Sequence, residues 1–95
     1  MFRSPKLLRS AKDQPCVICG DTGTTVSCHS NFIEHGKGTG IKASDVFTAR
    51  LCGYHHDLLD GRAGKLTKQE KWELFARAHQ RTVEAWFKEG LVVVK

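Results

Sequence analysis

Residues 51–61, LCGYHHDLLDG, decide how the rest of this sequence is interpreted. The stretch holds a cysteine, a histidine three residues later, and a second histidine directly after the first. Neighbouring residues on a helix point about 100° apart, so two adjacent histidines rarely bind one metal ion. We therefore expect His55 and His56 to face different partners.

Four side chains have the spacing of a structural zinc site. Cys16 and Cys19 form a C-x2-C pair typical of a zinc knuckle, and Cys52 and His55 form a C-x2-H pair of similar reach. Together they predict a site of three thiolates and one imidazole. In the alternative, Cys28 replaces His55 and the site is all thiolate. Cys28 can also be a small buried residue of a strand.

A second metal site is predicted on the same short helix. With His55 assigned to zinc, His56 and Asp60 are four residues apart and share a helix face. An imidazole and a carboxylate on one face suit Mg²⁺, Mn²⁺, Ni²⁺ or Zn²⁺. The alternative is that Asp60 is a turn residue beside Gly61.

The pattern of the chain predicts a small α+β fold in one domain of 95 residues. Residues 1–14 are expected to form a basic arm, residues 15–62 a zinc-braced core, and residues 67–89 a long amphipathic helix. Within the core, residues 24–29 and 45–52 have strand character, with a glycine-rich loop between them. A short helix is expected to follow the second strand and to stop at the glycine that ends the opening stretch.

The C-terminal helix has the clearest signals. Thr67 and Glu70 form a capping box, the usual start of a helix. Apolar and aromatic residues then recur every three or four positions and predict one buried face. They are Trp72, Phe75, His79, Val83 and Trp86.

Composition points to a polyanionic partner. Fifteen Lys and Arg against ten Asp and Glu give a net charge of +5, which favours nucleic acid, although simple solubility would explain it too. The sequence lacks the run of about 18–20 apolar residues that a membrane span needs and shows no secretory signal. We therefore expect a cytoplasmic protein, whose thiols stay reduced and free to bind metal.

A strand with His29, a glycine-rich loop, a second strand and a helix with His56 and Asp60 follow one another in this chain. This order, over residues 14–62, resembles the HNH endonucleases, also called the ββα-metal or His-Me finger class. Many members carry a similar zinc brace. The run HSN…GKGTGIKASD…LCGYHHDLLD is also similar to short proteins encoded by phages and prophages and regarded as nucleases.

The resemblance implies a role for each matching residue. His29 matches the general base and His56 the metal-binding histidine of the helix, while Asp60 matches a position that is often His, Asn or Asp. Cys28 stands where many relatives have Asp or His as a metal ligand, which is a departure from the pattern. The candidates for the middle asparagine of the motif are Asn31 and Asp45.

These observations predict a metal-dependent DNA endonuclease with structural zinc and a second divalent cation. Neutral His29 would accept a proton from water near pH 7, and cationic side chains would hold the phosphates without reading sequence. The alternative is a non-catalytic zinc-stabilised module that binds nucleic acid or protein, which would not need His29. The oligomeric state is left open. The candidate phosphate contacts are Lys37, Lys42, Arg50, Arg62 and Lys65.

Overall fold

The computed structural model describes residues 2–38 and 41–93 and confirms an α+β architecture with a two-stranded sheet and a C-terminal helix. Residues 39 and 40 of the predicted glycine-rich loop lie outside the described residues. The elements, in chain order, are α1 (Pro5–Arg9), β1 (Val26–His29), the 3-10 helix η1 (Ile33–His35), β2 (Thr48–Leu51), α2 (Gly53–Asp60) and α3 (Lys68–Lys88).

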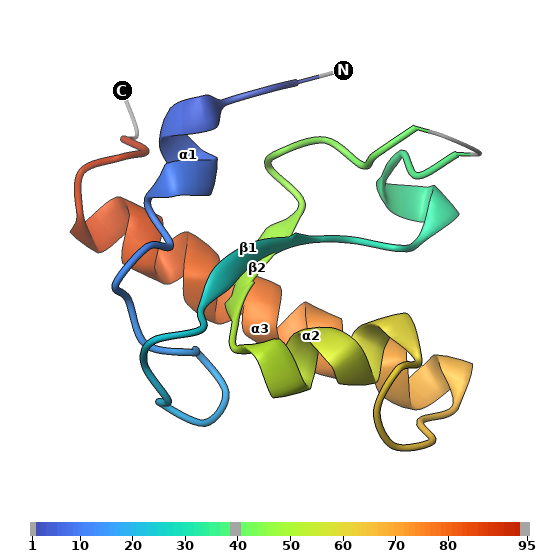
Figure 1. The fold of residues 1–95 in the computed structure, drawn as a ribbon. Coiled ribbons are helices and arrows are strands. Elements are labelled where there is room, and N and C mark those ends of the chain that lie inside the picture. The colour runs from blue at the N-terminus through green and yellow to red at the C-terminus, as the bar shows by residue number, and fades with distance from the viewer. Residues whose placement is uncertain (1, 39–40, 94–95) are drawn as a thin grey trace.

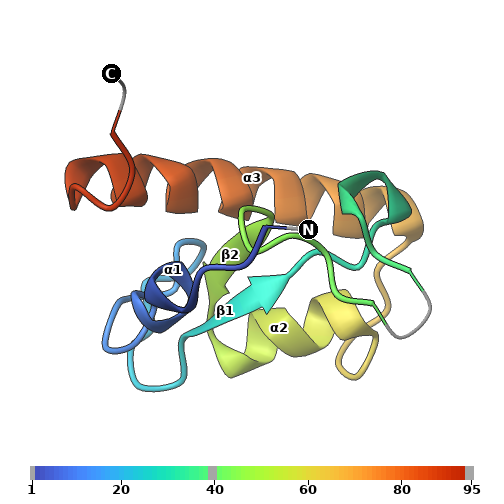
Figure 2. The ribbon, with the colours of Figure 1, turned by 90° about the horizontal axis from the view of Figure 1, so that it is seen from above.

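The sheet lies at the centre of the molecule. β1 and β2 pair antiparallel, from Val26 opposite Leu51 to His29 opposite Thr48. α3 runs along the back of the sheet and α2 lies in front of α3, as Figures 1 and 2 show together. All four residues of β2 are therefore buried, whereas β1 is buried only in part.

Polar side chains connect β2 to α3. The hydroxyl of Thr82 accepts a hydrogen bond from the backbone N–H of Arg50 at 2.9 Å and donates one to the carbonyl of Ala78. This contact satisfies a backbone donor of β2 that would otherwise be buried without a partner. It also fixes how far α3 is rotated against the sheet.

α3 begins as its sequence predicts, with both hydrogen bonds of the Thr67–Glu70 capping box present. Its buried positions are Phe75, Ala78, Thr82 and Trp86. The buried face is thus shifted slightly from the predicted one, and Trp72 remains 36% exposed. No helix within residues 2–38 and 41–93 is both long enough and apolar enough to cross a bilayer.

The N-terminal residues pack onto the fold, although the sequence suggests a basic arm. Ser4 caps α1 by accepting from the N–H of Leu7, and Leu7 and Ala11 are buried. The hydroxyl of Ser27 on β1 donates to the carbonyl of Leu8 at 2.8 Å. The segment therefore lies against β1, which brings its first residues toward the end of that strand.

Candidate metal centre and candidate active site

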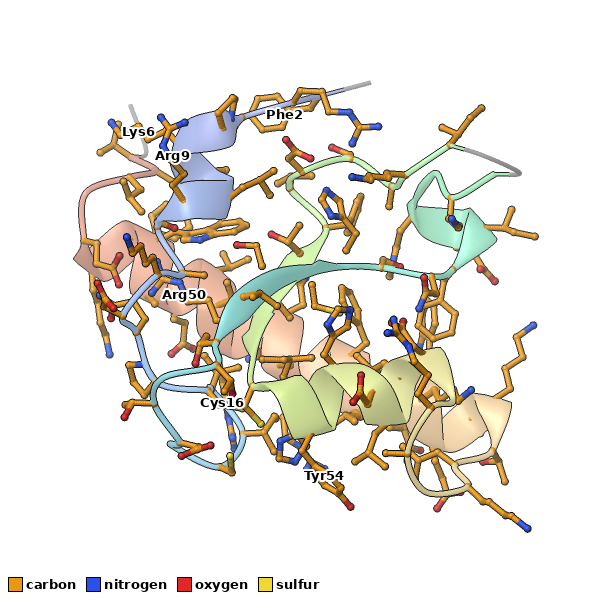
Figure 3. The ribbon with its side chains drawn as sticks, viewed as in Figure 1. Phe2, Lys6, Arg9, Cys16, Arg50 and Tyr54 are labelled. Carbon is orange, nitrogen blue, oxygen red and sulfur yellow. The ribbon has the colours of Figure 1, made fainter. Side chains whose placement is uncertain are left out.

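The four predicted zinc ligands meet at the junction of β2 and α2. Cys16 and Cys19 come from the turn before β1, while Cys52 is the N-cap of α2 and His55 lies in its first turn. Their donor atoms lie within 4.8 Å of one another. Figure 3 shows Cys16 beside the start of α2.

The distances in this cluster fit a tetrahedral zinc ion. The Sγ atoms of Cys19 and Cys52 are 3.8 Å apart, and Nδ1 of His55 lies 3.2 Å from Sγ of Cys52 and 3.7 Å from Sγ of Cys16. Zn–S bonds of about 2.3 Å predict S···S edges of about 3.8 Å in a tetrahedron. The described residues can therefore hold zinc through three sulfurs and one imidazole nitrogen, without Cys28.

The knuckle turn favours thiolate at one ligand. Burial raises the pKa of the Cys16 thiol, but backbone N–H groups of Cys19, Cys52 and Ile18 outweigh it, so the pKa lies below its ordinary value. The N–H of Asp21 lowers the pKa of Cys19, yet burial and the neighbouring sulfurs leave it raised. These N–H groups therefore favour the thiolate at Cys16, and thiolate is the form that binds metal.

A hollow of about 260 Å³ lies between β1, the segment that leads into β2, and α2. We call it the central hollow. It brings together six residues that the sequence predicts as catalytic, metal-binding or phosphate-binding. They are Cys28, His29, Lys37, Lys42, His56 and Asp60.

His29 is held on one side of the central hollow by a buried carboxylate. Its Nε2 lies 2.7 Å from Oδ1 of Asp45, whose side chain is only 3% exposed. Asp45 also accepts from the backbone N–H of Ser4 at 2.6 Å and from the guanidinium of Arg3 at 3.2 Å. Burial raises the pKa of Asp45, but donation from His29, Ser4 and Arg3 holds it below its usual range.

His56 and Asp60 also line the central hollow. Nε2 of His56 lies 3.2 Å from Oδ2 of Asp60, so the predicted helical spacing does place them together. Asn31 donates to Oδ1 of Asp60 at 2.8 Å, and Arg62 donates to Oδ2 at 2.5 Å. Burial raises the pKa of Asp60, but Asn31, Arg62 and His56 lower it overall, so the carboxylate stays ionised.

Comparison with known proteins decides the family. A family model described as "Putative nuclease YbcO" matches residues 5–91, nearly the whole chain. The chain belongs to the YbcO family. This confirms the expected kinship with nucleases, while the HNH assignment stays a prediction. Neither curated proteins nor solved structures gave a significant match.

Cys28 of this YbcO-family chain lies at the central hollow, away from the zinc cluster. Burial raises the pKa of its thiol to about 12, with a smaller contribution from the negative charge of Asp60. Without a metal ion nearby, the thiol is therefore protonated near neutral pH. The interpretation of Cys28 as a small buried residue fits this position.

Arg50 does not suit its predicted role as a phosphate contact. Its side chain is 3% exposed, and it donates twice to the carboxylate of Glu89, at 2.7 and 2.8 Å, and once to Ser10. Figure 3 shows Arg50 near α1 and α3, on the far side of β1 from α2. This arginine ties the end of α3 to β2 and does not line the central hollow.

The two remaining predicted cations lie beside α2. Arg62 lies two residues after the end of the helix and pairs with Asp60, which lines the central hollow. Lys65 is exposed in the turn between α2 and α3 and does not line the central hollow.

Sequence reasoning missed most of what supports His29. The sequence predicts Asp45 only as a candidate for the middle position of the motif, and Arg3 only as part of the basic arm. These residues are separated from His29 by 16 and 26 positions, so no local pattern links them. The one available signal was that Asp45 is the sole acidic residue between Glu34 and Asp57.

Proposed function

We propose that this YbcO-family chain is a metal-dependent DNA endonuclease of the ββα-metal (HNH) type, with β1, β2 and α2 as the ββα unit. One observation carries the proposal: His29, which is hydrogen-bonded to Asp45, lines the same hollow as the His56–Asp60 pair. Membership of a family described as nucleases supports hydrolysis of nucleic acid as the reaction.

His29 acts as the general base in this proposal. Because Nε2–H donates to Asp45, the neutral ring carries its lone pair on Nδ1, which can accept a proton. That nitrogen takes the proton of the water that attacks the phosphorus, while the bond from phosphorus to the leaving oxygen breaks. The ionised Asp45 then stabilises the imidazolium that forms, as in other carboxylate–histidine pairs.

His56 and Asp60 are suited to hold the second cation. Donor atoms 3.2 Å apart match two neighbouring ligands of one ion, since metal–ligand bonds of about 2.1 Å at 90° place donors about 3 Å apart. Such a cation would offset negative charge on the phosphate and the leaving oxygen. The guanidinium of Arg62 must move away from Oδ2 of Asp60 before His56 and Asp60 can both bind the cation.

Lys37 and Lys42 are proposed to hold the phosphates on either side of the cleaved bond. Both line the central hollow together with His29. Ammonium groups bind the DNA backbone without distinguishing bases, so we expect cleavage with little sequence preference. The structural zinc would act at a distance, by fixing the start of α2, and hence His56, relative to β1.

Cleavage by a His29→Ala variant tests the proposal. The assay is nicking of supercoiled DNA by zinc-loaded protein with added Mg²⁺, Mn²⁺ or Ni²⁺. We expect the rate to fall by about 10²- to 10⁴-fold, the contribution of a positioned base. Zinc content and DNA affinity should remain. The matched control is His79→Ala, because His79 lies on α3 and donates to the carbonyl of Val46, outside the central hollow.

Two results would contradict an endonuclease. In one, the parent protein cuts no DNA with any of the three metals. In the other, the folded His29→Ala variant cuts as fast as the parent. Either result would favour a zinc-stabilised binding module.

A further inference from the structure

A second cavity opens beside the central hollow and shares His29 and Asn31 with it. We call it the side cavity. Its volume is about 220 Å³, and its apolar walls are formed by Phe32, Leu59 and Phe75. At about 30 Å³ per water molecule, this is room for roughly seven waters, the scale of a single heteroaromatic ring system.

The apolar walls are part of the folded core and are already in place. Phe32 is 9% exposed, Leu59 6% and Phe75 2%. The ring of Phe32 packs edge-on against the rings of Trp72 and Phe75, with distances between ring centroids of 4.8 and 6.3 Å. A flat ring that enters the side cavity therefore meets fixed aromatic and aliphatic surfaces, with little further loss of side-chain entropy.

Two lysines add positive charge to this apolar cavity. Lys68 and Lys71 lie one helical turn apart at the start of α3 and both line it. Within the described part of the chain, neither ammonium group forms an ion pair. The capping box already occupies the N–H of Glu70 with the Thr67 hydroxyl, so the lysines supply the attraction for an anion, and the helix terminus does not.

We propose that the side cavity receives the nucleobase next to the phosphate held at His29, so that the preferred substrate is DNA with an unpaired nucleotide at the cleavage position. This inference rests on the proposed function. Apolar walls beside two cations match a nucleotide, which joins an uncharged flat ring to an anionic backbone. In a duplex the base must first leave the stack, at a cost of about a few kcal/mol, whereas an unpaired base enters without that cost.

A binding experiment with three DNA probes tests the proposal. The probes are a perfect duplex, the same duplex with one unpaired thymidine, and that bulged duplex with an abasic residue in place of the thymidine. The zinc-loaded full chain is used without added divalent metal, and a gel verifies that each probe stays intact. We expect the thymidine bulge to bind about tenfold tighter than the abasic bulge, as base stacking predicts.

Two variants locate the effect. Leu59→Phe narrows the side cavity and should remove the preference for the base over the abasic residue. Lys71→Ala should weaken binding of both bulged probes. Lys88→Ala is its control, because Lys88 lies 17 residues further along α3, about 25 Å at 1.5 Å per residue. Zinc content and melting temperature identify a variant that does not fold. The comparison of the thymidine bulge with the abasic bulge uses the parent protein and does not depend on any variant.

Equal affinity for the thymidine and abasic bulges would overturn the proposal, as would a folded Leu59→Phe variant that keeps the preference. These outcomes are separate from those for the proposed function. Cleavage of DNA without base preference would retain the endonuclease and reject the side cavity as a base site. Base preference without cleavage under any metal would retain the side cavity as a base site and reject the endonuclease.

Discussion

At the scale of the residue, the decisive pair is His29 and Asp45. The imidazole is 18% exposed and faces the central hollow, while the carboxylate behind it is almost fully buried. A buried carboxylate is costly unless hydrogen bonds compensate it, and Asp45 accepts from His29, Arg3 and the backbone of Ser4. Three hydrogen-bond donors thus stabilise one ionised carboxylate behind this histidine.

An Asp45→Asn variant should cut DNA at least about 100-fold more slowly, within the usual contribution of a base. The amide keeps the shape of the side chain but loses its charge, and it can turn an NH₂ group toward Nε2 of His29 and so favour the unproductive tautomer. The measurement is the nicking rate of zinc-loaded protein. Asp57→Asn is the matched control, since Asp57 is 45% exposed, does not line the central hollow and pairs with Arg62 only at 4.0 Å. An unchanged rate for Asp45→Asn would show that Asp45 does not orient the base.

Arg50 shows what residue identity cannot reveal. A cation between a glycine-rich loop and a metal-binding helix suggests a phosphate contact. The structure instead pairs it with Glu89, which lies 39 residues later in the chain. Spacing along the chain contains no information about such a pair.

At the scale of the element, the sequence predicts the helices whose ends depend on neighbouring residues. It does not predict the short helices that depend on contacts with distant parts of the chain. The limits of α2 and α3 follow from Gly61 and from the Thr67–Glu70 box, which act within one helical turn. α1 and η1 are stabilised in part by contacts with distant residues and were not predicted. The candidate zinc ligands can be recognised in the sequence because a short C-x2-C and a short C-x2-H each supply half of a tetrahedral donor set.

Loss of one zinc ligand should uncouple these elements. We expect Cys16→Ser to lose zinc and to lower the melting temperature by roughly 40 °C or more, because structural zinc contributes on the order of 10 kcal/mol to folding. Cys28→Ser is the matched control and should keep a full zinc content, since Cys28 lies outside the cluster. Metal analysis and thermal melting measure both effects. Zinc retained by Cys16→Ser and lost by Cys28→Ser would reverse the ligand assignment.

At the scale of the whole molecule, carboxylates stabilise the fold through distant partners. The bidentate Arg50 guanidinium lowers the pKa of Glu89, with burial opposing it. Because the folded pKa lies below the unfolded value of about 4.3, this contribution is present above that pH and is lost as the pH falls through the folded value.

A Glu89→Gln variant should therefore melt several degrees below the parent at neutral pH, and this difference should shrink as the pH falls below about 4. We expect roughly 4–8 °C, equivalent to about 1 kcal/mol in a domain of this size after allowance for solvent exposure. Acid would remove zinc from the parent and the variant alike, so the difference between their melting temperatures at each pH reports the charge of Glu89. A difference that does not change with pH would show that the charge of Glu89 contributes nothing.

The net charge of +5 should make DNA binding strongly dependent on salt. Each phosphate contact contributes about −0.9 to the slope of log K against log salt concentration. The double variant Lys37→Ala, Lys42→Ala should therefore flatten the slope by about 2. A control pair, Lys12→Ala with Lys88→Ala, removes the same charge at exposed sites that do not line the central hollow. Equal slopes for the two double variants would contradict a phosphate-binding role for this hollow.

The zinc cluster also has a consequence for partial unfolding. A zinc ion bound there would join Cys19 to Cys52, 33 positions apart, and so would close a ring of the chain that contains both strands and His29. A cross-link over that span removes about 4 kcal/mol of chain entropy from the open state. α1 and α3 lie outside the ring and can detach while the hairpin remains closed. Amide protons of α1 should thus exchange with solvent through a low-energy opening, whereas those of β1 and β2 exchange only when zinc leaves.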